Sequence, residues 1–408
     1  MRVLIVGSGG REHALAWKLA QEHEVHACPG NPGIGMVAEC HPESPEQVAN
    51  VVRPDLIVIG PEGPLIEGLA DRLRQSGHLV FGPGAGGARL EGSKVFSKQL
   101  MLEAGVPTAV SGTFNEVHDA SAFARQLLEA SGKAVIKASG AALGKGVVIC
   151  SSQAEVDDTL QSMLVDKDLG EAGSEVVVEE FLDGFEFSLL TLCNEQGSLS
   201  LPVAQDYKRA LDNNRGPNTG GMGTYSPVAS VSSTLISQTE SQFVHPLLQA
   251  LKNRGIAYRG VLFSGVMVKN GDPYCLEYNV RFGHPETQSV MRRLGVSFGE
   301  ALYATARGEP IPKVEILDNA VVTVVMASAG YPGSVEKGLP ISFGVMPPEV
   351  VVFHAGTAQI DGKLCTAGGR VLGVSAVGSS IAKARDNAYA AVGNIRFDGA
   401  QFRTDIGA

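Results

Sequence analysis

The sequence has no closely spaced cysteines. Its six cysteines, at positions 28, 40, 150, 193, 275 and 365, are all at least twelve residues apart. This excludes the C-x-x-C spacing of zinc ribbons and thiol redox motifs. Because free cysteine is among the most buried residue types, we expect six reduced thiols in the interior.

The chain also lacks long apolar runs and an excess of positive charge. No apolar run approaches the roughly 18 residues that a membrane-spanning helix needs, and residues 1–6 lead directly into a strand-like segment instead of a secretion signal. With 33 basic and 43 acidic residues, the net charge is −10, which argues against nucleic-acid binding. We therefore expect a cytoplasmic protein with no membrane or nucleic-acid partner.

Glycine, in contrast, is abundant. It contributes 50 of the 408 residues, about 12% against a usual 7% or so. A chain of this length predicts two to four domains. The excess of glycine predicts loops in which the backbone must approach a ligand closely.

Residues 2–90 predict βαβ units around a parallel sheet, since short apolar runs alternate with helical stretches. The expected strands are 3–6, 24–28, 55–59 and 79–81, and the expected helices are 12–21 and 65–76. The loops 7–10, 31–33 and 60–62 each follow a strand. They should meet at the carboxyl edge of the sheet, where such folds bind ligands.

The rest of the chain predicts α+β units. A helix at 94–104 precedes strands at 134–137, 147–150, 176–181 and 186–193, with a helix near 154–165. Strands at 261–268 and 274–278 alternate with helices near 234–253 and 286–306. A linker around 311–318 leads to strands at 321–326, 350–354, 363–366 and 371–375 and a helix at 380–395.

The loop 7–10 invites a dinucleotide-binding interpretation, but the fingerprint G-x-G-x-x-G requires glycine where Glu12 stands. The second strand also ends without an acid for a ribose hydroxyl. Two alternatives stay open at this point: a phosphate bound by free amides at a helix N-terminus, or a purely structural turn.

The glycine-rich loop 139–146, preceded by Lys137, is not a Walker A loop because Gly146 follows Lys145 where serine or threonine is required. Its glycines and lysines could still hold phosphate oxygens. A flexible surface hairpin is the alternative.

Three residues of the segment 275–286 share a strand face, because side chains alternate with period two. Glu277 and Asn279 offer hard oxygen ligands for Mg²⁺, and Arg281 can grip a carboxylate or phosphate. An ordinary polar strand face is the alternative.

Two further segments are candidates for binding. Residues 179–186 could present an apolar wall and an acid to a nucleoside, although taken alone they favour a plain strand and turn, because acids are common there. Residues 205–209 lead into the glycine-rich turn 216–223, which we expect to bind an anion more readily than to serve as a linker. A zinc protease or serine hydrolase is not supported, because H-E-x-x-H and G-x-S-x-G are both missing.

Together, the motifs at 92–94, 137–146, 179–182 and 277–281 resemble the ATP-grasp superfamily. The segments 6–13, 30–33, 60–62, 216–223 and 281–288 further resemble the phosphoribosylamine–glycine ligase family, and 353–357 and 368–373 resemble its last domain. The similarity spans essentially the whole chain.

The resemblance implies an α/β and α+β multidomain protein with an ATP-grasp fold. It implies a parallel α/β, biotin-carboxylase-like domain at 1–92, an ATP-grasp region at 93–317 with a small lid at about 113–182, and a mixed β domain at 318–408. The family uses ATP, with Mg²⁺ or Mn²⁺, to join glycine to 5-phosphoribosylamine in purine biosynthesis, through a glycyl phosphate. A monomer or weak homodimer is expected.

The resemblance also implies roles for individual residues. It places Arg281, Asp206 and Lys145 at the reacting groups, and Glu277 and Asn279 at the metal. The ATP-binding residues would be Lys94, Lys137, Ser139, Gly140, Gly144, Gly146, Glu179, Phe181, Leu182 and Glu186. The substrate-binding residues would be Gly9, Gly10, Arg11, Glu12, Asn31, Pro32, Gly33, Pro61, Glu62, Asn218, Thr219, Gly220 and Gly221.

The sequence departs from the family pattern at a few positions. The family usually has Asp where His284 stands, His where Tyr207 stands, and a Gly/Asp-rich stretch at 211–215. No second acidic metal ligand is found around 265–267. These departures motivate a second hypothesis, an ATP-grasp ligase with other substrates. A third is a nucleotide or sugar-phosphate binder without catalysis.

Overall fold

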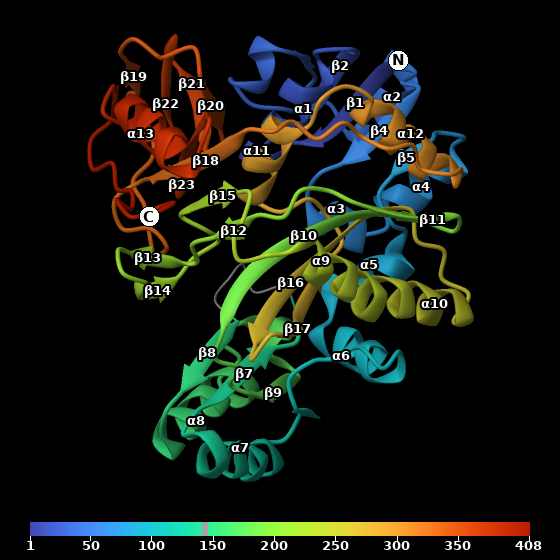
Figure 1. Cartoon of the computed structure of the whole chain (residues 1–408), viewed down its shortest axis with the longest axis vertical. Helices are drawn as coiled ribbons and strands as arrows, with labels where there is room; N and C mark the ends of the chain where they lie inside the picture. The colour runs from blue at the N-terminus through green and yellow to red at the C-terminus, as the bar shows by residue number, and fades with distance from the viewer. Residues whose placement is uncertain (141–145) are drawn as a thin grey trace.

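The computed structural model describes residues 1–140 and 146–408. The N-terminal part contains the predicted parallel sheet, with strand order β3-β2-β1-β4-β5 (Figure 1). Its strands are β1 (Arg2–Gly7), β2 (Glu24–Pro29), β3 (Glu39–Cys40), β4 (Leu56–Ile59) and β5 (Val80–Phe81). Its helices are α1 (Gly10–Leu19), α2 (Pro45–Val52), α3 (Glu62–Ile66), α4 (Leu69–Gln75) and α5 (Ala85–Gly92).

The helix predicted at 65–76 is two helices, because Gly68 between α3 and α4 adopts a left-handed conformation with φ 78°. A left-handed residue interrupts the helical hydrogen-bond ladder, and glycine adopts that conformation without steric cost.

A second, antiparallel sheet of order β6-β9-β7-β8 has its own core and lies at the bottom of the view in Figure 1. Its elements are β6 (Ser111–Phe114), α7 (Val117–Ser131), β7 (Ala134–Ala138), β8 (Val147–Cys150), α8 (Gln153–Leu160) and β9 (Val176–Glu180). The three strands predicted here at 134–137, 147–150 and 176–181 are confirmed. Helix α6 (Lys94–Glu103) leads into this part of the chain.

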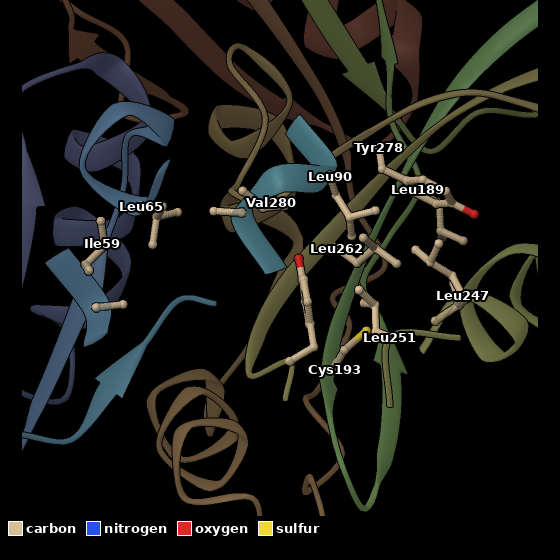
Figure 2. Close-up of a cluster of buried hydrophobic side chains, with 14 of the residues drawn as sticks. Ile59, Leu65, Leu90, Leu189, Cys193, Leu247, Leu251, Leu262, Tyr278 and Val280 are labelled. Carbon is tan, nitrogen blue, oxygen red and sulfur yellow. The ribbon is translucent and has the colours of Figure 1, made fainter. Parts of the chain in front are cut away.

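Long strands connect the N-terminal sheet to this second sheet. They form an antiparallel sheet of order β11-β10-β16-β17, made of β10 (Phe185–Asn194), β11 (Gly197–Ser200), β16 (Gly260–Lys269) and β17 (Asp272–Asn279). Their buried side chains join those of the N-terminal elements in one hydrophobic core. In Figure 2, Ile59 and Leu65 lie on one side of this core, and Leu189 and Leu262 on the other.

The third large sheet, of order β12-β15-β18-β23-β20, combines two distant parts of the chain. Two of its strands, β12 (Gln205–Asp206) and β15 (Gly223–Ser226), come from the middle of the chain. Although β15 ends almost a hundred residues before β18 (Ala320–Ala327) begins, the two strands pair antiparallel. The other strands are β18 (Ala320–Ala327), β20 (Val350–His354) and β23 (Arg370–Gly378), packed by α13 (Ile381–Val392). The small antiparallel pairs are β13 (Arg209–Leu211) with β14 (Arg215–Asn218), β19 (Ser342–Phe343) with β24 (Ile395–Arg396), and β21 (Thr357–Ile360) with β22 (Lys363–Thr366).

Two long predicted helices are interrupted. The segment 234–253 is α9 (Ser233–Thr239), a π-helical turn (Glu240–Val244) and α10 (His245–Asn253). The segment 286–306 is α11 (Glu286–Val290), a 3₁₀ turn (Met291–Arg293) and α12 (Phe298–Arg307). Between the 3₁₀ turn and α12, Leu294 is extended and Ser297 has φ 71°, so the chain leaves the helical conformation there.

All six cysteines are free thiols, as predicted, and five are buried while Cys40 is half-buried. Among the described residues, no helix combines the length and the apolar character needed to cross a membrane.

Candidate active site

A cleft of about 540 Å³ lies where the three parts of the fold meet. It is lined by the beginning of α1, α6, β7, β17 and loops of the C-terminal part. The structure brings fourteen of the predicted site residues together at this cleft: Gly9, Arg11, Glu12, Glu62, Lys94, Lys137, Gly146, Glu179, Asp206, Thr219, Gly220, Glu277, Asn279 and Arg281.

Two lysines line the part of the cleft next to β7. Lys94, at the start of α6, donates to the carbonyl of Gly140 at 3.2 Å, and burial lowers its pKa. Lys137 forms an ion pair with Glu179 at 2.7 Å. Burial alone would lower the pKa of Lys137, but Glu179 outweighs it and raises the pKa. Both cations can therefore meet the oxygens of a phosphate chain at this wall.

Glu179 is almost completely buried and forms a second ion pair, with Lys98 at 2.8 Å. Burial alone would raise the pKa of Glu179, but the two lysines outweigh this effect and lower it. This carboxylate therefore holds two cations at the wall of the cleft.

The C-terminal end of β17 provides two of the three residues predicted to share a strand face; the prediction was wrong for Arg281, because the strand ends at Asn279. Glu277 and Asn279 both line the cleft. They are two residues apart on β17 and therefore project from the same face, and Arg281 follows the strand. Arg281 pairs with Glu91 at 3.0 Å and with Glu62 at 3.5 Å. These carboxylates outweigh the effect of burial and raise the pKa of Arg281, so the guanidinium keeps its charge.

The N-terminus of α1 is capped by the side chain of one of the helix's own residues, Glu12. The carboxylate of Glu12 accepts a hydrogen bond from the amide of Gly9 at 2.6 Å and pairs with Arg11 at 2.6 Å. A Cβ at Gly60 would lie 2.2 Å from Oε1 of Glu12, so this carboxylate fills the space between the loops. An internal carboxylate thus takes the place expected for a bound phosphate, and a dinucleotide fingerprint is not formed.

An acidic and basic cluster lines the other side of the cleft. Lys208 pairs with Asp206 at 3.2 Å and with Glu186 at a shorter distance. Burial would lower the pKa of Lys208, but Asp206, Glu186 and Glu277 raise it. Glu286 is buried nearby, accepts a hydrogen bond from Ser188 at 3.1 Å, and has its pKa raised to about 7 by burial and by Asp206.

The C-terminal part holds the turn 219–221. The hydroxyl of Tyr331 accepts from the amide of Gly220 at 3.0 Å, and Arg370 donates to the carbonyls of Gly220 and His284. His284 itself lines the cleft. Burial and the neighbouring Arg370 lower its pKa well below the usual value, so its imidazole is neutral.

Tyr207 points away from the cleft. Asp206 and Lys208 line the cleft on either side of it, as the period of a strand requires. The hydroxyl of Tyr207 accepts from the amide of Gly407 at 3.0 Å, and Arg403 lies over its ring at 4.7 Å. The turn 211–215 also contacts this C-terminal tail, through Asp212 and the amide of Thr404. The departures from the family pattern at Tyr207 and at 211–215 therefore contribute to a contact with the C-terminal tail and not to the cleft.

Comparison with known families identifies the relatives of this chain. Three sequence models match: phosphoribosylglycinamide synthetase N domain at residues 1–91, its ATP-grasp (A) domain at 92–287 and its C domain at 321–408. The phosphoribosylamine–glycine ligase of Rhizobium meliloti (strain 1021) is 44% identical, with 100% of this chain and 98% of the relative covered. This chain belongs to the phosphoribosylamine–glycine ligase family.

Solved structures agree with this assignment. The phosphoribosylamine–glycine ligase of Thermotoga maritima superposes with a TM-score of 0.89 at 39% identity, covering 99% of this chain and 100% of that one. A biotin carboxylase domain of Hydrogenobacter thermophilus, solved with MgADP, ADP and bicarbonate, has a TM-score of 0.74 at 17% identity over 98% of this chain and 91% of its own. The expected ATP-grasp fold is confirmed, and this fold implies ATP binding and the use of a divalent metal.

Some residues that the family resemblance suggested do not line the cleft. Leu182 packs against Ala109 and Met267, and Lys133 lies over the ring of Phe181 at 4.3 Å. Asn31 donates to the carbonyls of Ser8 and His354, and thus joins the N-terminal and C-terminal parts. The others outside the cleft are Gly10, Pro32, Gly33, Pro61, Ser139, Gly140, Glu186, Asn218 and Gly221. Gly144 and Lys145 lie outside the described residues.

The cleft also contains residues that the sequence analysis did not assign to the site. These are chiefly Glu91, Lys98, Glu286, Tyr331 and Arg370. Lys98 could have been found, because it lies one helical turn after Lys94. Arg370 lies in the segment 368–373 that resembles the last domain of the family, but nothing local in the sequence connects it or Tyr331 with the turn at 220, which is over a hundred residues away from each.

Proposed function

We propose that the cleft ligates glycine to 5-phosphoribosylamine with ATP, giving glycinamide ribonucleotide, ADP and phosphate. The observation that carries this proposal is the convergence of three groups in one cleft of a family member. These are the lysine pair Lys94 and Lys137, the oxygen ligands Glu277 and Asn279, and Arg281.

The first step is the activation of a poor electrophile. A carboxylate oxygen of glycine attacks the γ-phosphorus of ATP, ADP leaves, and glycyl phosphate forms. Lys94 and Lys137 would hold phosphate oxygens, and Arg281 would reduce the repulsion between the two anions. Arg281 is suited to this role because Glu91 and Glu62 fix its orientation and keep it charged.

Glu277 and Asn279 fit a hard divalent cation, Mg²⁺ or Mn²⁺, because both offer oxygen ligands on one strand face. Glu277 also interacts electrostatically with Lys94, Lys137 and Lys208, so it lies among the cations that phosphates would meet. The metal would neutralise phosphate charge during transfer.

The second step forms the amide bond. The amine nitrogen of the phosphoribosylamine attacks the carbonyl carbon of glycyl phosphate, phosphate leaves, and the nitrogen loses a proton. We assign this proton to Asp206, whose pKa is raised by burial. Arg11 and the turn at 219–220 would contact the anionic groups of the substrates, and the carboxylates of Glu12 and Glu62 would accept hydrogen bonds from their hydroxyl or ammonium groups.

The decisive experiment is ADP release measured with each substrate omitted in turn. We expect release only when ATP, metal, glycine and phosphoribosylamine are all present. Release that ignores glycine would contradict the proposal, and tight ATP binding without turnover would identify a non-catalytic binder instead.

One observation favours a second candidate, a ligase for another small carboxylate. His284 lines the cleft where the family usually has Asp, and it is neutral. A panel of small amino acids and hydroxy acids would reveal such a preference. A strict requirement for glycine would rule it out.

We further propose the division into domains at 1–92, 93–317 and 318–408, with residues 113–182 as a lid over the cleft. A cytoplasmic enzyme that is a monomer or weak homodimer fits this assignment. Light scattering after size-exclusion chromatography would measure the oligomeric state, and a stable larger assembly would contradict the expectation.

A further inference from the structure

A repeated Glu-x-His pattern lies on two neighbouring strands, away from the cleft. One copy is Glu24-Val25-His26 on β2, and the other is Glu39-Cys40-His41, which begins on β3. The strands are parallel, and His26 is the register partner of Glu39. Because side chains alternate along a strand, both glutamates and both histidines project from the same face of the sheet.

Three of these side chains converge on one point. Nδ1 of His26 lies 2.9 Å from Nε2 of His41 and 3.7 Å from Oε2 of Glu39. Nε2 of His41 lies 4.0 Å from Oε1 of Glu39. Zinc bonds of about 2.0–2.1 Å in a tetrahedral arrangement place ligand atoms roughly 3.3 Å apart, so small adjustments complete such a site.

Glu24 provides the support that metal-binding histidines usually have. Its Oε1 lies 3.1 Å from Nε2 of His26 and 2.9 Å from Nε of Arg2. A proton on Nε2 of His26 leaves the lone pair of Nδ1 directed at His41. Carboxylates that hold the far nitrogen of a ligating histidine in this way fix its tautomer and orientation.

We propose that His26, His41 and Glu39 bind a divalent transition-metal ion such as Zn²⁺. Two imidazole nitrogens and one carboxylate favour Zn²⁺ over Mg²⁺, which prefers oxygen ligands. His26 is buried, while the side chain of Glu39 is 69% exposed, so an ion can enter from solvent. The ion would join the edge strand β3 to β2. The segment 30–38, which carries Asn31, connects these two strands, so the ion would hold the strands on either side of it together.

The test is a Zn²⁺ titration of the full-length, metal-stripped protein in the presence of excess Mg²⁺, with a competing chromophoric chelator. We expect one tightly bound equivalent. Glu39→Gln, at an exposed position, and His41→Gln should each weaken binding by more than about 100-fold, and Glu24→Gln by about 10–100-fold. Circular dichroism would verify that each variant is folded.

The matched control is His23→Gln. His23 lies in another His–carboxylate cluster, with Glu22 and Glu300. Its replacement should leave the affinity and stoichiometry of the tightly bound Zn²⁺ ion unchanged. Loss of that equivalent in His23→Gln, or equal Zn²⁺ affinity in the wild type and His41→Gln, would overturn the proposal.

Co²⁺ distinguishes the proposed ligands from thiols. Cys40 lies between Glu39 and His41 in the sequence, and its side chain projects from the opposite face of the strand. We expect Co²⁺ to bind with the weak visible absorption of nitrogen and oxygen ligands. An intense sulfur-to-cobalt charge-transfer band would overturn the assignment.

Discussion

Arg281 is the single residue whose loss should damage catalysis most clearly. Arg281→Ala removes the charge next to the reacting carboxylate and phosphate, so we expect kcat/KM to fall by roughly 10²–10³. Steady-state kinetics would measure this. Arg307→Ala, at an exposed ion pair with Glu309, is the matched control and should retain the wild-type rate. An unchanged rate in Arg281→Ala would remove this residue from the site.

Glu277 should affect the metal more than the fold. Glu277→Gln keeps the size of the side chain while removing its charge, so we expect more metal to be needed for half-maximal activity and little change in stability. Titrations with Mg²⁺ and Mn²⁺ would measure the shift. Asp272→Asn, exposed at the start of the same strand, is the control. Superimposable titration curves for Glu277→Gln and the wild type would show that the ligand assignment is wrong.

Glu286 should make stability depend on pH. Its pKa in the folded protein is raised to about 7, from 4.5, by burial and by Asp206. The folded state therefore holds this proton more tightly than the unfolded state, and the associated stability is present below pH 4.5 and lost as pH rises towards 7. Glu286→Gln cannot ionise. The stability of this variant relative to the wild type should thus be greater at pH 8 than at pH 5.

Urea unfolding at the two pH values would test this expectation. The exposed Glu116→Gln is the control, and its effect should be the same at both. A difference between Glu286→Gln and the wild type that does not change with pH would contradict the role of burial at Glu286.

At the scale of elements, the extended segment 206–208, which begins at the end of β12, has two faces with different roles. Tyr207 faces the C-terminal tail, so Tyr207→Phe should lose the hydrogen bond to Gly407 and about 1 kcal/mol of unfolding free energy. The ring and its contact with Arg403 remain. Because the ring points away from the cleft, kcat should not change.

Asp206→Asn, at the neighbouring position, provides the contrast, since we expect it to lower kcat. Urea unfolding and steady-state kinetics of both variants would separate the two faces. A lower kcat in Tyr207→Phe without a loss of stability would show that Tyr207 contributes to the site.

The elements themselves were predictable where one local rule governs the chain. Alternating apolar runs identified the parallel sheet, and the period of a strand placed Glu277 and Asn279 on one face. The single helix expected at 286–306 was wrong, because Leu294 is extended, the amide of Gly295 donates to the carbonyl of Glu315, and Ser297 is left-handed. Periodicity reports which side chains become buried, and it does not report such a break.

At the scale of the whole molecule, the cleft depends on contacts between distant segments. Glu91 reaches Arg281 across 190 residues, and Arg370 reaches Gly220 across 150. The pairing of β15 with β18 places the turn at 220 on a sheet completed by the C-terminal part. Such partners have no common local pattern, so the sequence motifs revealed one side of each interaction and left the other unidentified.

The contact between the N-terminal and C-terminal parts can be tested with the only tryptophan in the chain. Trp17, on α1, packs edge-to-face against Phe353 of β20 at 5.9 Å, and His13 contacts the same ring at 5.4 Å. Phe353 is completely buried. Phe353→Ala should therefore cost about 3–5 kcal/mol of unfolding free energy and change the fluorescence of Trp17 in the folded protein.

Phe343→Ala is the matched control, because Phe343 is 40% exposed and stacks on His354 in the same part of the chain. It should cost much less and leave the fluorescence of Trp17 unchanged. Urea unfolding followed by fluorescence and by circular dichroism would measure both variants. If Phe353→Ala leaves both the fluorescence and the stability unchanged, this contact does not hold the two parts together, and other contacts between them, such as the hydrogen bond from Asn31 to the carbonyl of His354, must do so.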